Sequence, residues 1–171
     1  AGTSVARDFV ELPSQIMENW AFQPEVLATY ARHYETGEII PAELVEKINA
    51  TGTFNQGFMT TELAAAAILD LKWHMLESME GVDPMAFEAS ACKAMGLIDE
   101  IIPRYRTTYF AHIFSGGYSA GYYSYLWAEV LDKDAFELFM EKGIFDKETA
   151  MSFRTNILEK GGSEEPMELY R

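Results

Sequence analysis

A histidine and a group of tyrosines lie close together in the stretch HIFSGGYSAGYYSY, which runs from His112 to Tyr125. Phenols stay protonated at neutral pH, so a row of them can donate hydrogen bonds to a developing oxyanion without carrying charge. If a helix begins near Tyr118, the hydroxyls of Tyr118, Tyr122 and Tyr125 share one face, because they recur after four and three residues. His112 could donate to the same intermediate or to a substrate carbonyl. The stretch therefore predicts neutral donors that face a reacting carbonyl group.

Two glycines, Gly116 and Gly117, separate the histidine from the tyrosines. Glycine adopts backbone conformations closed to other residues, and its small size permits the close approach of a ligand or of a moving loop. Together with the phenols, these glycines indicate a mobile clamp. The competing interpretation is simpler, because an aromatic stripe at helical spacing usually packs in the core.

Acidic and amide side chains recur in the stretch RDFVELPSQIMENW. Asp8, Glu11, Gln15 and Glu18 lie three or four residues apart, so a continuous helix would place them on one face. Such a stripe is commonly the solvated face of an amphipathic helix. The functional alternative is that Glu11 binds a metal ion, since hydrolytic zinc sites combine histidine and glutamate ligands.

The histidines decide whether Glu11 belongs to a complete site. The chain contains His33, His74 and His112, and none of them forms a His-x-x-x-His pair. Zinc in hydrolytic sites takes three protein ligands and a water molecule. The residues by themselves therefore predict no complete metal site, and we interpret His33 and His74 as structural.

Composition limits the class of protein. With 171 residues, of which 49% are apolar, the chain is long enough for one globular domain with a core of normal size. The net charge of −14 argues against a nucleic-acid partner, because such a chain repels phosphate backbones. The longest apolar run, LAAAAILDL, is interrupted by Asp70, so no membrane span is expected. The single cysteine, Cys92, can form no disulfide within the chain.

Helical spacing dominates the chain, and β-alternation is scarce. We therefore predict an all-α helical bundle with one irregular glycine-rich loop in residues 97–117. Pro13 would bend the first helix or be relieved locally. The expected helices are residues 5–22, 24–34, 41–50, 54–80, 84–95 and 118–143, one that Asp146 caps and Gly161 ends, and one that Ser163 caps.

Three stretches together resemble a known family. Two of them resemble the thimet oligopeptidase and peptidyl-dipeptidase family of zinc metallopeptidases: GTSVARDFVELPSQIMENW and RYRTTYFAHIFSGGYSAGYYSYLWAEVL. The second of these stretches is most similar to the bacterial dipeptidyl carboxypeptidase branch of that family. The tail, GIFDKETAMSFRTNILEKGGSEEPMELYR, is similar to the same family. The resemblance extends over essentially the whole chain. It implies that residues 1–171 are the C-terminal part of the catalytic domain of a larger zincin-type helical peptidase.

In that family, two histidines of a His-Glu-x-x-His helix and a later glutamate hold zinc, and Glu11 occupies the place of that glutamate. The zinc polarises the scissile carbonyl and lowers the pKa of a bound water molecule toward about 7. The His-Glu-x-x-His helix would lie just before Ala1, so the resemblance implies a fragment that lacks two ligands and the catalytic glutamate. We expect this fragment alone to be inactive and to bind zinc weakly if at all. Asp8 and Gln15 could orient the ligand shell.

The resemblance also implies roles around the glycine-rich loop, where a histidine and tyrosines of the family contact substrate and stabilise the tetrahedral intermediate. The matching positions are His112, Tyr118, Tyr122 and Tyr125, and the hinge glycines match Gly116 and Gly117. An exopeptidase that removes dipeptides needs a cation for the terminal carboxylate of its substrate, and arginine binds a carboxylate bidentately. Arg104 and Arg106 are candidates, although ordinary surface positions would also explain them.

The leading hypothesis is therefore that the chain is part of a zinc peptidase, which acts on short peptides and releases C-terminal dipeptides. Its expected partners are peptide substrates and the preceding part of its own chain, with dimerisation through exposed surface left open. The resemblance favours a cytoplasmic address and leaves the periplasm open. The alternative is a non-catalytic helical protein-interaction domain, in which the tyrosines and the acidic surface serve partner binding.

Overall fold

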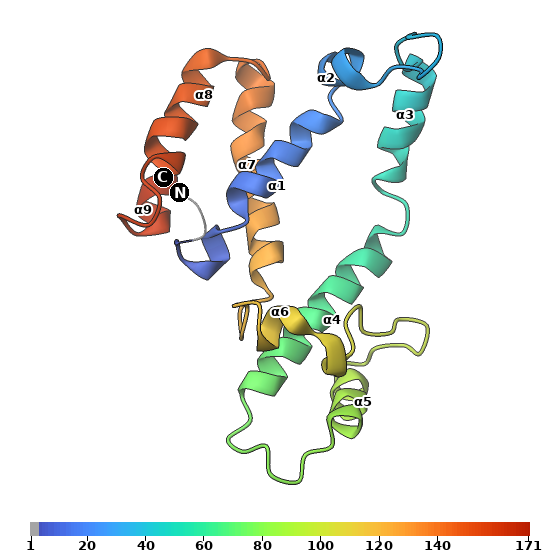
Figure 1. Cartoon of the computed structure of the whole chain (residues 1–171), viewed down its shortest axis with the longest axis vertical. Coiled ribbons are helices and arrows are strands. Elements are labelled where there is room, and N and C mark those ends of the chain that lie inside the picture. The colour runs from blue at the N-terminus through green and yellow to red at the C-terminus, as the bar shows by residue number, and fades with distance from the viewer. Residues whose placement is uncertain (1–3) are drawn as a thin grey trace. The chain divides into compact units, whose positions relative to one another are not determined.

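The computed structural model describes residues 4–171. Within that range every regular element is helical, apart from one isolated antiparallel bridge between Arg32 and Ile39 (Figure 1). The predicted all-α class is thus confirmed for the described residues, whereas the first three residues of the predicted domain 1–171 lie outside them. None of the described helices is long and apolar enough to cross a membrane.

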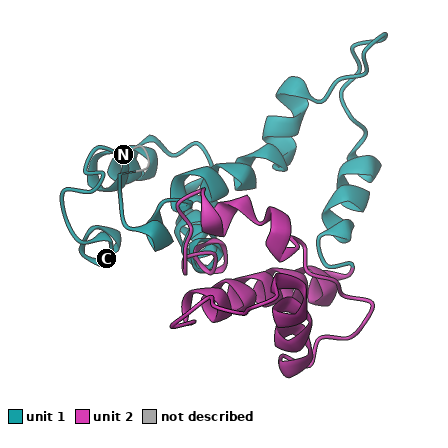
Figure 2. Ribbon diagram, turned by 60° about the horizontal axis from the view of Figure 1, so that its bottom comes forward, with its two compact units in different colours: residues 1–54, 127–171 teal, residues 55–126 magenta. Residues whose placement is uncertain are grey.

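The described chain divides into two compact units, coloured teal and magenta in Figure 2. Unit 2 is Asn55–Leu126, and unit 1 comprises the described residues before it together with Trp127–Arg171. The division falls within the long helix α7, Ser124–Lys142, whose first residues belong to unit 2. Each unit buries an apolar cluster of its own.

Unit 1 is held together by an aromatic and aliphatic core. Trp20 packs edge-on against Phe136 and Phe139, with ring centroids 4.6 and 4.8 Å away, and its Nε1 donates to the carbonyl of Ile144 at 2.7 Å. These contacts join the first helix of the unit to α7. Besides most of α7, the elements of unit 1 are the 3-10 helix η1 (Arg7–Phe9), α1 (Leu12–Ala21), α2 (Pro24–Tyr30), α3 (Ala42–Thr51), α8 (Lys147–Phe153), the π-helical turn η3 (Arg154–Leu158) and α9 (Pro166–Tyr170).

Unit 2 is built on the helix α4, whose run of alanines favours helix and lets neighbouring elements approach closely. Its buried Leu69 and Trp73 pack in one cluster with Phe110, Ile113 and Tyr122, which lie near the other end of the unit's sequence. The core therefore joins α4 to the predicted functional stretch. Besides the start of α7, the elements of unit 2 are α4 (Gln56–His74), α5 (Pro84–Ala94), the 3-10 helix η2 (Thr107–Tyr109) and α6 (Ala111–Phe114).

Two predicted helix caps are confirmed. The carboxylates of Asp83 and Asp146 each accept a backbone N–H from three residues later, at 2.7 Å in both cases, and start α5 and α8. Other helix boundaries were predicted wrongly. Helix α2 stops at Tyr30, four residues before the predicted end at 34. Helix α4 stops at His74, six residues before the predicted end at 80, and Glu165 instead of Ser163 precedes α9.

The first predicted helix starts too early. Residues Arg7–Phe9 form η1, and α1 begins only at Leu12, with Pro13 in its first turn. Proline fits there because the first N–H groups of a helix have no partner within the helix. Asp8 and Glu11 consequently precede α1, so the prediction of a polar stripe on one continuous helical face is also wrong.

The helix predicted from Tyr118 starts too early as well. Helix α7 begins at Ser124, and residues 119–123 form turns in which Ala120 has a positive φ of 52°. A non-glycine residue rarely adopts that left-handed conformation, and it is incompatible with a continuing right-handed helix. The tyrosines before Ser124 are therefore positioned by a turn.

Candidate functional site

Three tyrosine rings pack together around the turn that precedes α7, although only Tyr125 lies within the helix. The rings of Tyr118 and Tyr125 stack with centroids 5.3 Å apart and planes 16° from parallel. Tyr122 packs edge-on against Tyr125 at 5.1 Å. The structure thus brings these three predicted residues together, but through a turn and not through one helical face.

Tyr122 differs from the other two tyrosines in burial. Its side chain is 3% exposed and belongs to the core of unit 2, whereas Tyr118 and Tyr125 are half-buried at the edge of that core. Burial raises the pKa of Tyr122 to about 12, so its phenol stays neutral far above physiological pH. This position favours the packing interpretation for Tyr122 and leaves Tyr118 and Tyr125 as the accessible pair.

His112 lies in α6 and belongs to the same aromatic group. Its ring centroid is 4.9 Å from that of Tyr105, 5.7 Å from Tyr122 and 6.2 Å from Tyr118. Its backbone carbonyl accepts a hydrogen bond from the N–H of Tyr118 at 2.9 Å. His112 and Tyr118 are therefore joined by both a backbone hydrogen bond and a ring contact within unit 2.

The glycine pair connects α6 to the tyrosine turn by a tight backbone path. Gly117 has a φ of +82°, in the left-handed region that favours glycine. Gly116 packs directly on α6, because a Cβ there would lie 2.9 Å from the Cα of His112 and 3.0 Å from its carbonyl oxygen. Both glycines are thus required by the loop's geometry, each for a different reason.

We expect Gly116→Ala to lower the free energy of unfolding by about 1–3 kcal/mol, since the new methyl group forces a backbone shift at α6. The matched control is Gly57→Ala in α4, where a Cβ would meet nothing within 4 Å. That change should leave stability equal or raise it by about 0.5–1 kcal/mol, because alanine is the better helix former. Urea denaturation of both variants measures the difference, and equal stabilities would contradict the close approach at Gly116.

The two arginines before the loop have different surroundings. Arg104 is exposed, and its guanidinium lies 5.8 Å from the ring centroid of Tyr105. Arg106 instead forms an ion pair through its Nε with Glu88 of α5, a carboxylate that is 2% exposed. The other oxygen of Glu88 accepts the backbone N–H of Thr107 at 2.6 Å. Arg106 is therefore engaged in holding this segment against α5, and Arg104 is the freer cation.

Glu11 lies in unit 1, at the residue that precedes α1. Its side chain is half-buried, and its Oε2 accepts a hydrogen bond from the Ser14 hydroxyl at 3.1 Å. Helix α1 is itself fixed to α7, because Asn19 Nδ2 donates to the buried carboxylate of Asp132 at 2.9 Å. The carboxylate of Glu11 thus lies at the start of a helix that is hydrogen-bonded to α7.

The donor set around Glu11 limits what this chain can bind. Among residues 4–171, no group of three or more histidine, cysteine, aspartate and glutamate side chains is placed to hold a metal ion. Glu11 therefore fits as one carboxylate ligand of a zinc site, and the described residues do not complete a three-ligand site around it. A three-ligand site would need donors from elsewhere.

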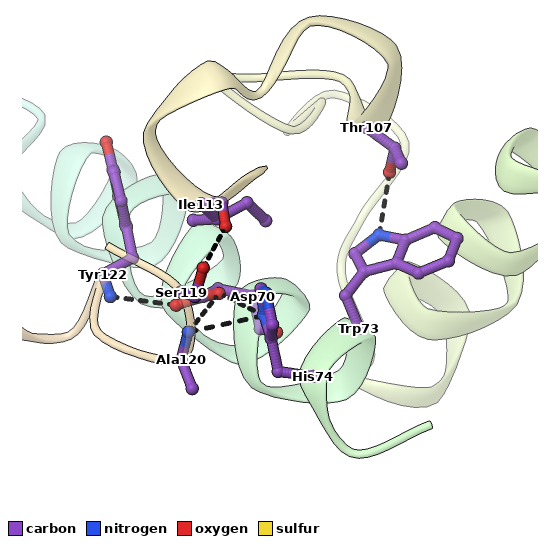
Figure 3. A network of polar contacts seen from close by, with 8 residues as sticks. All are labelled: Asp70, Trp73, His74, Thr107, Ile113, Ser119, Ala120 and Tyr122. Carbon is purple, nitrogen blue, oxygen red and sulfur yellow. Dashed lines mark hydrogen bonds and ion pairs between the residues drawn. The ribbon is translucent and has the colours of Figure 1, made fainter. Parts of the chain in front are cut away.

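Sequence reasoning missed several residues that contact the predicted site residues or the loop around them. Asp70 is fully buried in α4 and accepts backbone N–H groups from the tyrosine turn (Figure 3). Glu88 and Ser14 were not singled out either. An aspartate inside the apolar run LAAAAILDL was the available signal, because a buried carboxylate is retained only where hydrogen bonds stabilise it.

Comparisons with known proteins agree with the resemblance seen in the sequence. The description "Peptidase family M3" belongs to the family model that matches residues 1–171. The chain is 48% identical to dipeptidyl carboxypeptidase of Escherichia coli over 174 residues, which cover 100% of this chain and 25% of that protein. It is 47% identical to dipeptidyl carboxypeptidase of Salmonella typhimurium, over 99% of this chain and 25% of that protein.

Oligopeptidase A of Escherichia coli is similar at 43% identity, over 99% of this chain and 25% of that protein. The chain is therefore similar both to proteins named dipeptidyl carboxypeptidase and to a protein named oligopeptidase A. In each comparison the chain spans about a quarter of the relative's length.

Proposed function

Because the chain belongs to peptidase family M3, whose members are zinc-dependent helical peptidases, we propose that it is the C-terminal part of a zinc peptidase's catalytic domain. The whole protein hydrolyses short peptides and releases C-terminal dipeptides. In this proposal the chain contributes one metal ligand and the donors for the reacting carbonyl. The preceding part of the protein contributes the remaining ligands and the catalytic glutamate.

One observation carries the proposal furthest: Tyr118 and Tyr125, seven residues apart, stack at 5.3 Å beside the ring of His112. A turn with a glycine pair holds them, and neither tyrosine is fully buried. If Tyr118 and Tyr125 served only to pack the core, their side chains would not need to stay partly exposed. A pair of neutral donors at the edge of a core is instead suited to an oxyanion.

The proposed roles of this chain's residues follow from their chemistry. When bound, zinc polarises the scissile carbonyl and acidifies a water molecule. Glu11 holds the ion from the start of α1, with Ser14 restricting its carboxylate. Tyr118 and Tyr125 donate hydrogen bonds to the oxyanion, where the loss of one donor typically costs about 3 kcal/mol in the transition state. His112 donates to the substrate.

The substrate's terminal carboxylate needs a cation, and we propose Arg104 ahead of Arg106. Arg104 is exposed, whereas Arg106 is paired with the buried Glu88. Arg104→Ala should reduce the preference for a free over an amidated C-terminus by about tenfold or more, since a charge-assisted hydrogen bond is lost. The ratio of kcat/KM for the two peptides measures that preference.

Arg106→Ala is the informative comparison. It leaves the carboxylate of Glu88 buried without its cation, and should lower the free energy of unfolding by about 1–3 kcal/mol. If Arg104→Ala keeps the preference for a free C-terminus and Arg106→Ala loses it, the assignment is reversed. If both variants keep the preference, neither arginine binds the substrate's carboxylate.

The proposed activity is tested on the full-length protein that contains this chain. Loaded with stoichiometric zinc, it should cleave short peptides that have a free C-terminus, and mass spectrometry should identify dipeptides among the products. Removal of the metal by a chelator should abolish cleavage, and zinc should restore it. Longer released fragments would change the proposal to an oligopeptidase, and no hydrolysis by the zinc-loaded protein would contradict it.

No observation favours the alternative of a non-catalytic interaction domain. For the cellular address we propose the cytoplasm, and cell fractionation tests this against the periplasm. Dimerisation remains a prediction that analytical ultracentrifugation of the full-length protein can test.

A further inference from the structure

The carboxylate of Asp70 is an unusual feature of the core of unit 2. It lies in α4 with no exposed surface, and both of its oxygens accept backbone N–H groups from the tyrosine turn. Oδ1 accepts from Ala120 and Oδ2 from Tyr122, each at 2.9 Å (Figure 3). A buried carboxylate is costly unless such charge-assisted bonds stabilise it, so this arrangement is specific to one loop conformation.

These bonds account for a conformation that the turn would not adopt by itself. Ala120 has a φ of +52°, which is strained for a residue with a side chain. Its N–H and that of Tyr122 point to Asp70, and α7 begins only after them, at Ser124. The carboxylate therefore determines where the turn ends and the helix starts.

Further contacts from the same part of α4 hold the loop. His74 Nδ1 lies 2.8 Å from Asp70 Oδ1, and Trp73 Nε1 donates to the Thr107 hydroxyl at 3.0 Å. Within the loop, the Ser119 hydroxyl donates to the carbonyl of Ile113 at 2.6 Å. The last turns of α4 thus fix both the entry to α6 and the exit toward α7, as Figure 3 shows.

Tyr118 and Tyr125 flank the turn that Asp70 holds, so their separation depends on it. We propose that Asp70 is a positioning residue of the peptidase, which sets the register of Tyr118 and Tyr125 by binding the N–H groups of Ala120 and Tyr122. This inference rests on the proposed function, because it gives the tyrosine pair a role in the reaction. Asp70 itself touches no substrate.

Asp70→Asn tests the inference in the full-length, zinc-loaded protein. Asparagine keeps one acceptor oxygen and presents an NH₂ group to the second N–H, so one of the two bonds is lost. We expect kcat to fall on the order of tenfold to a hundredfold, with KM changed less than about threefold, because displacing catalytic groups by an ångström has effects of that size. Amide hydrogen exchange at Ala120 and Tyr122 should become faster.

A double variant separates positioning from a general loss of structure. If Asp70 acts through Tyr118 and Tyr125, the loss of kcat in Asp70→Asn combined with Tyr125→Phe should be smaller than the product of the two single losses. Two independent effects that multiply would overturn the inference, as would an unchanged kcat in Asp70→Asn. The matched control is Asp83→Asn at the start of α5, where asparagine caps a helix as well as aspartate and activity should be unchanged.

Ser119→Ala keeps the inference testable if Asp70→Asn fails to fold. It removes a single hydroxyl from the same turn and should lower kcat by about threefold to tenfold. Combined with Tyr125→Phe, the loss of kcat should be smaller than the product of the two single losses. An effect that multiplies with Tyr125→Phe, or no effect, would contradict the positioning role of the turn. The proposed function fails separately, when the unsubstituted, zinc-loaded protein hydrolyses no peptide.

Discussion

Tyr125→Phe in the full-length, zinc-loaded protein should lower kcat by about a hundredfold, with a much smaller change in KM. The substitution keeps the ring that stacks on Tyr118 at 5.3 Å and removes only the hydroxyl. If that hydroxyl bonds to the oxyanion, its energy appears in the transition state and not in substrate binding. Steady-state kinetics on a short peptide measure both constants.

A matched substitution shows whether the effect is specific. Tyr109 lies in the same unit, is 59% exposed and has no proposed role, so Tyr109→Phe should leave kcat and KM unchanged. Unchanged kcat in Tyr125→Phe would remove Tyr125 from the mechanism. A rise in KM with constant kcat would instead make Tyr125 a substrate-binding residue.

Glu11→Gln should weaken zinc binding by the full-length protein by at least about a hundredfold. Loss of a residue that only hydrogen-bonds to a metal ligand already lowers metal affinity by about 10–100-fold, and loss of a ligand should cost at least as much. Glutamine is a poor zinc ligand, yet has nearly the same size and can still accept the Ser14 hydrogen bond. Activity at limiting zinc should fall in parallel. Competition with a chelator of known affinity measures the change.

Glu18→Gln is the control for that experiment, since Glu18 is an exposed carboxylate on the same helix, α1. It removes the same charge and should keep zinc affinity within about twofold, because solvent and salt screen an exposed charge that is not a ligand. Equal zinc affinity in Glu11→Gln and the parent protein would show that Glu11 is not a ligand.

The helical class and two helix caps were predictable because they depend on local chemistry. Asp83 and Asp146 start their helices through side-chain contacts three residues ahead, which sequence spacing reveals. The start of α7 was not predictable in that way. It depends on Asp70, which lies about fifty residues earlier in the sequence. Its carboxylate accepts hydrogen bonds from the N–H groups of Ala120 and Tyr122, which would otherwise be available to a local helix.

The candidate site shows the same limit. Spacing grouped Tyr118 and Tyr125, and the structure also brings them together, but through a strained turn that spacing could not reveal. Nothing local distinguished Arg104 from Arg106, because the difference lies in the buried Glu88 of another helix. The prediction that Glu11 is a ligand comes from resemblance to a family, because its spacing alone favoured an ordinary polar face.

The central claim is that this chain supplies a zinc ligand, Glu11, and two oxyanion donors, Tyr118 and Tyr125, to the full-length peptidase. The most direct test is a crystal structure of the full-length protein with zinc and a phosphinic peptide, which imitates the tetrahedral intermediate, using anomalous scattering to locate the metal. We predict a Glu11 carboxylate oxygen about 2.0–2.2 Å from zinc, and the hydroxyls of Tyr118 and Tyr125 within hydrogen-bond distance of the phosphinate. Zinc bound without Glu11, or both tyrosines away from the inhibitor, would contradict the claim.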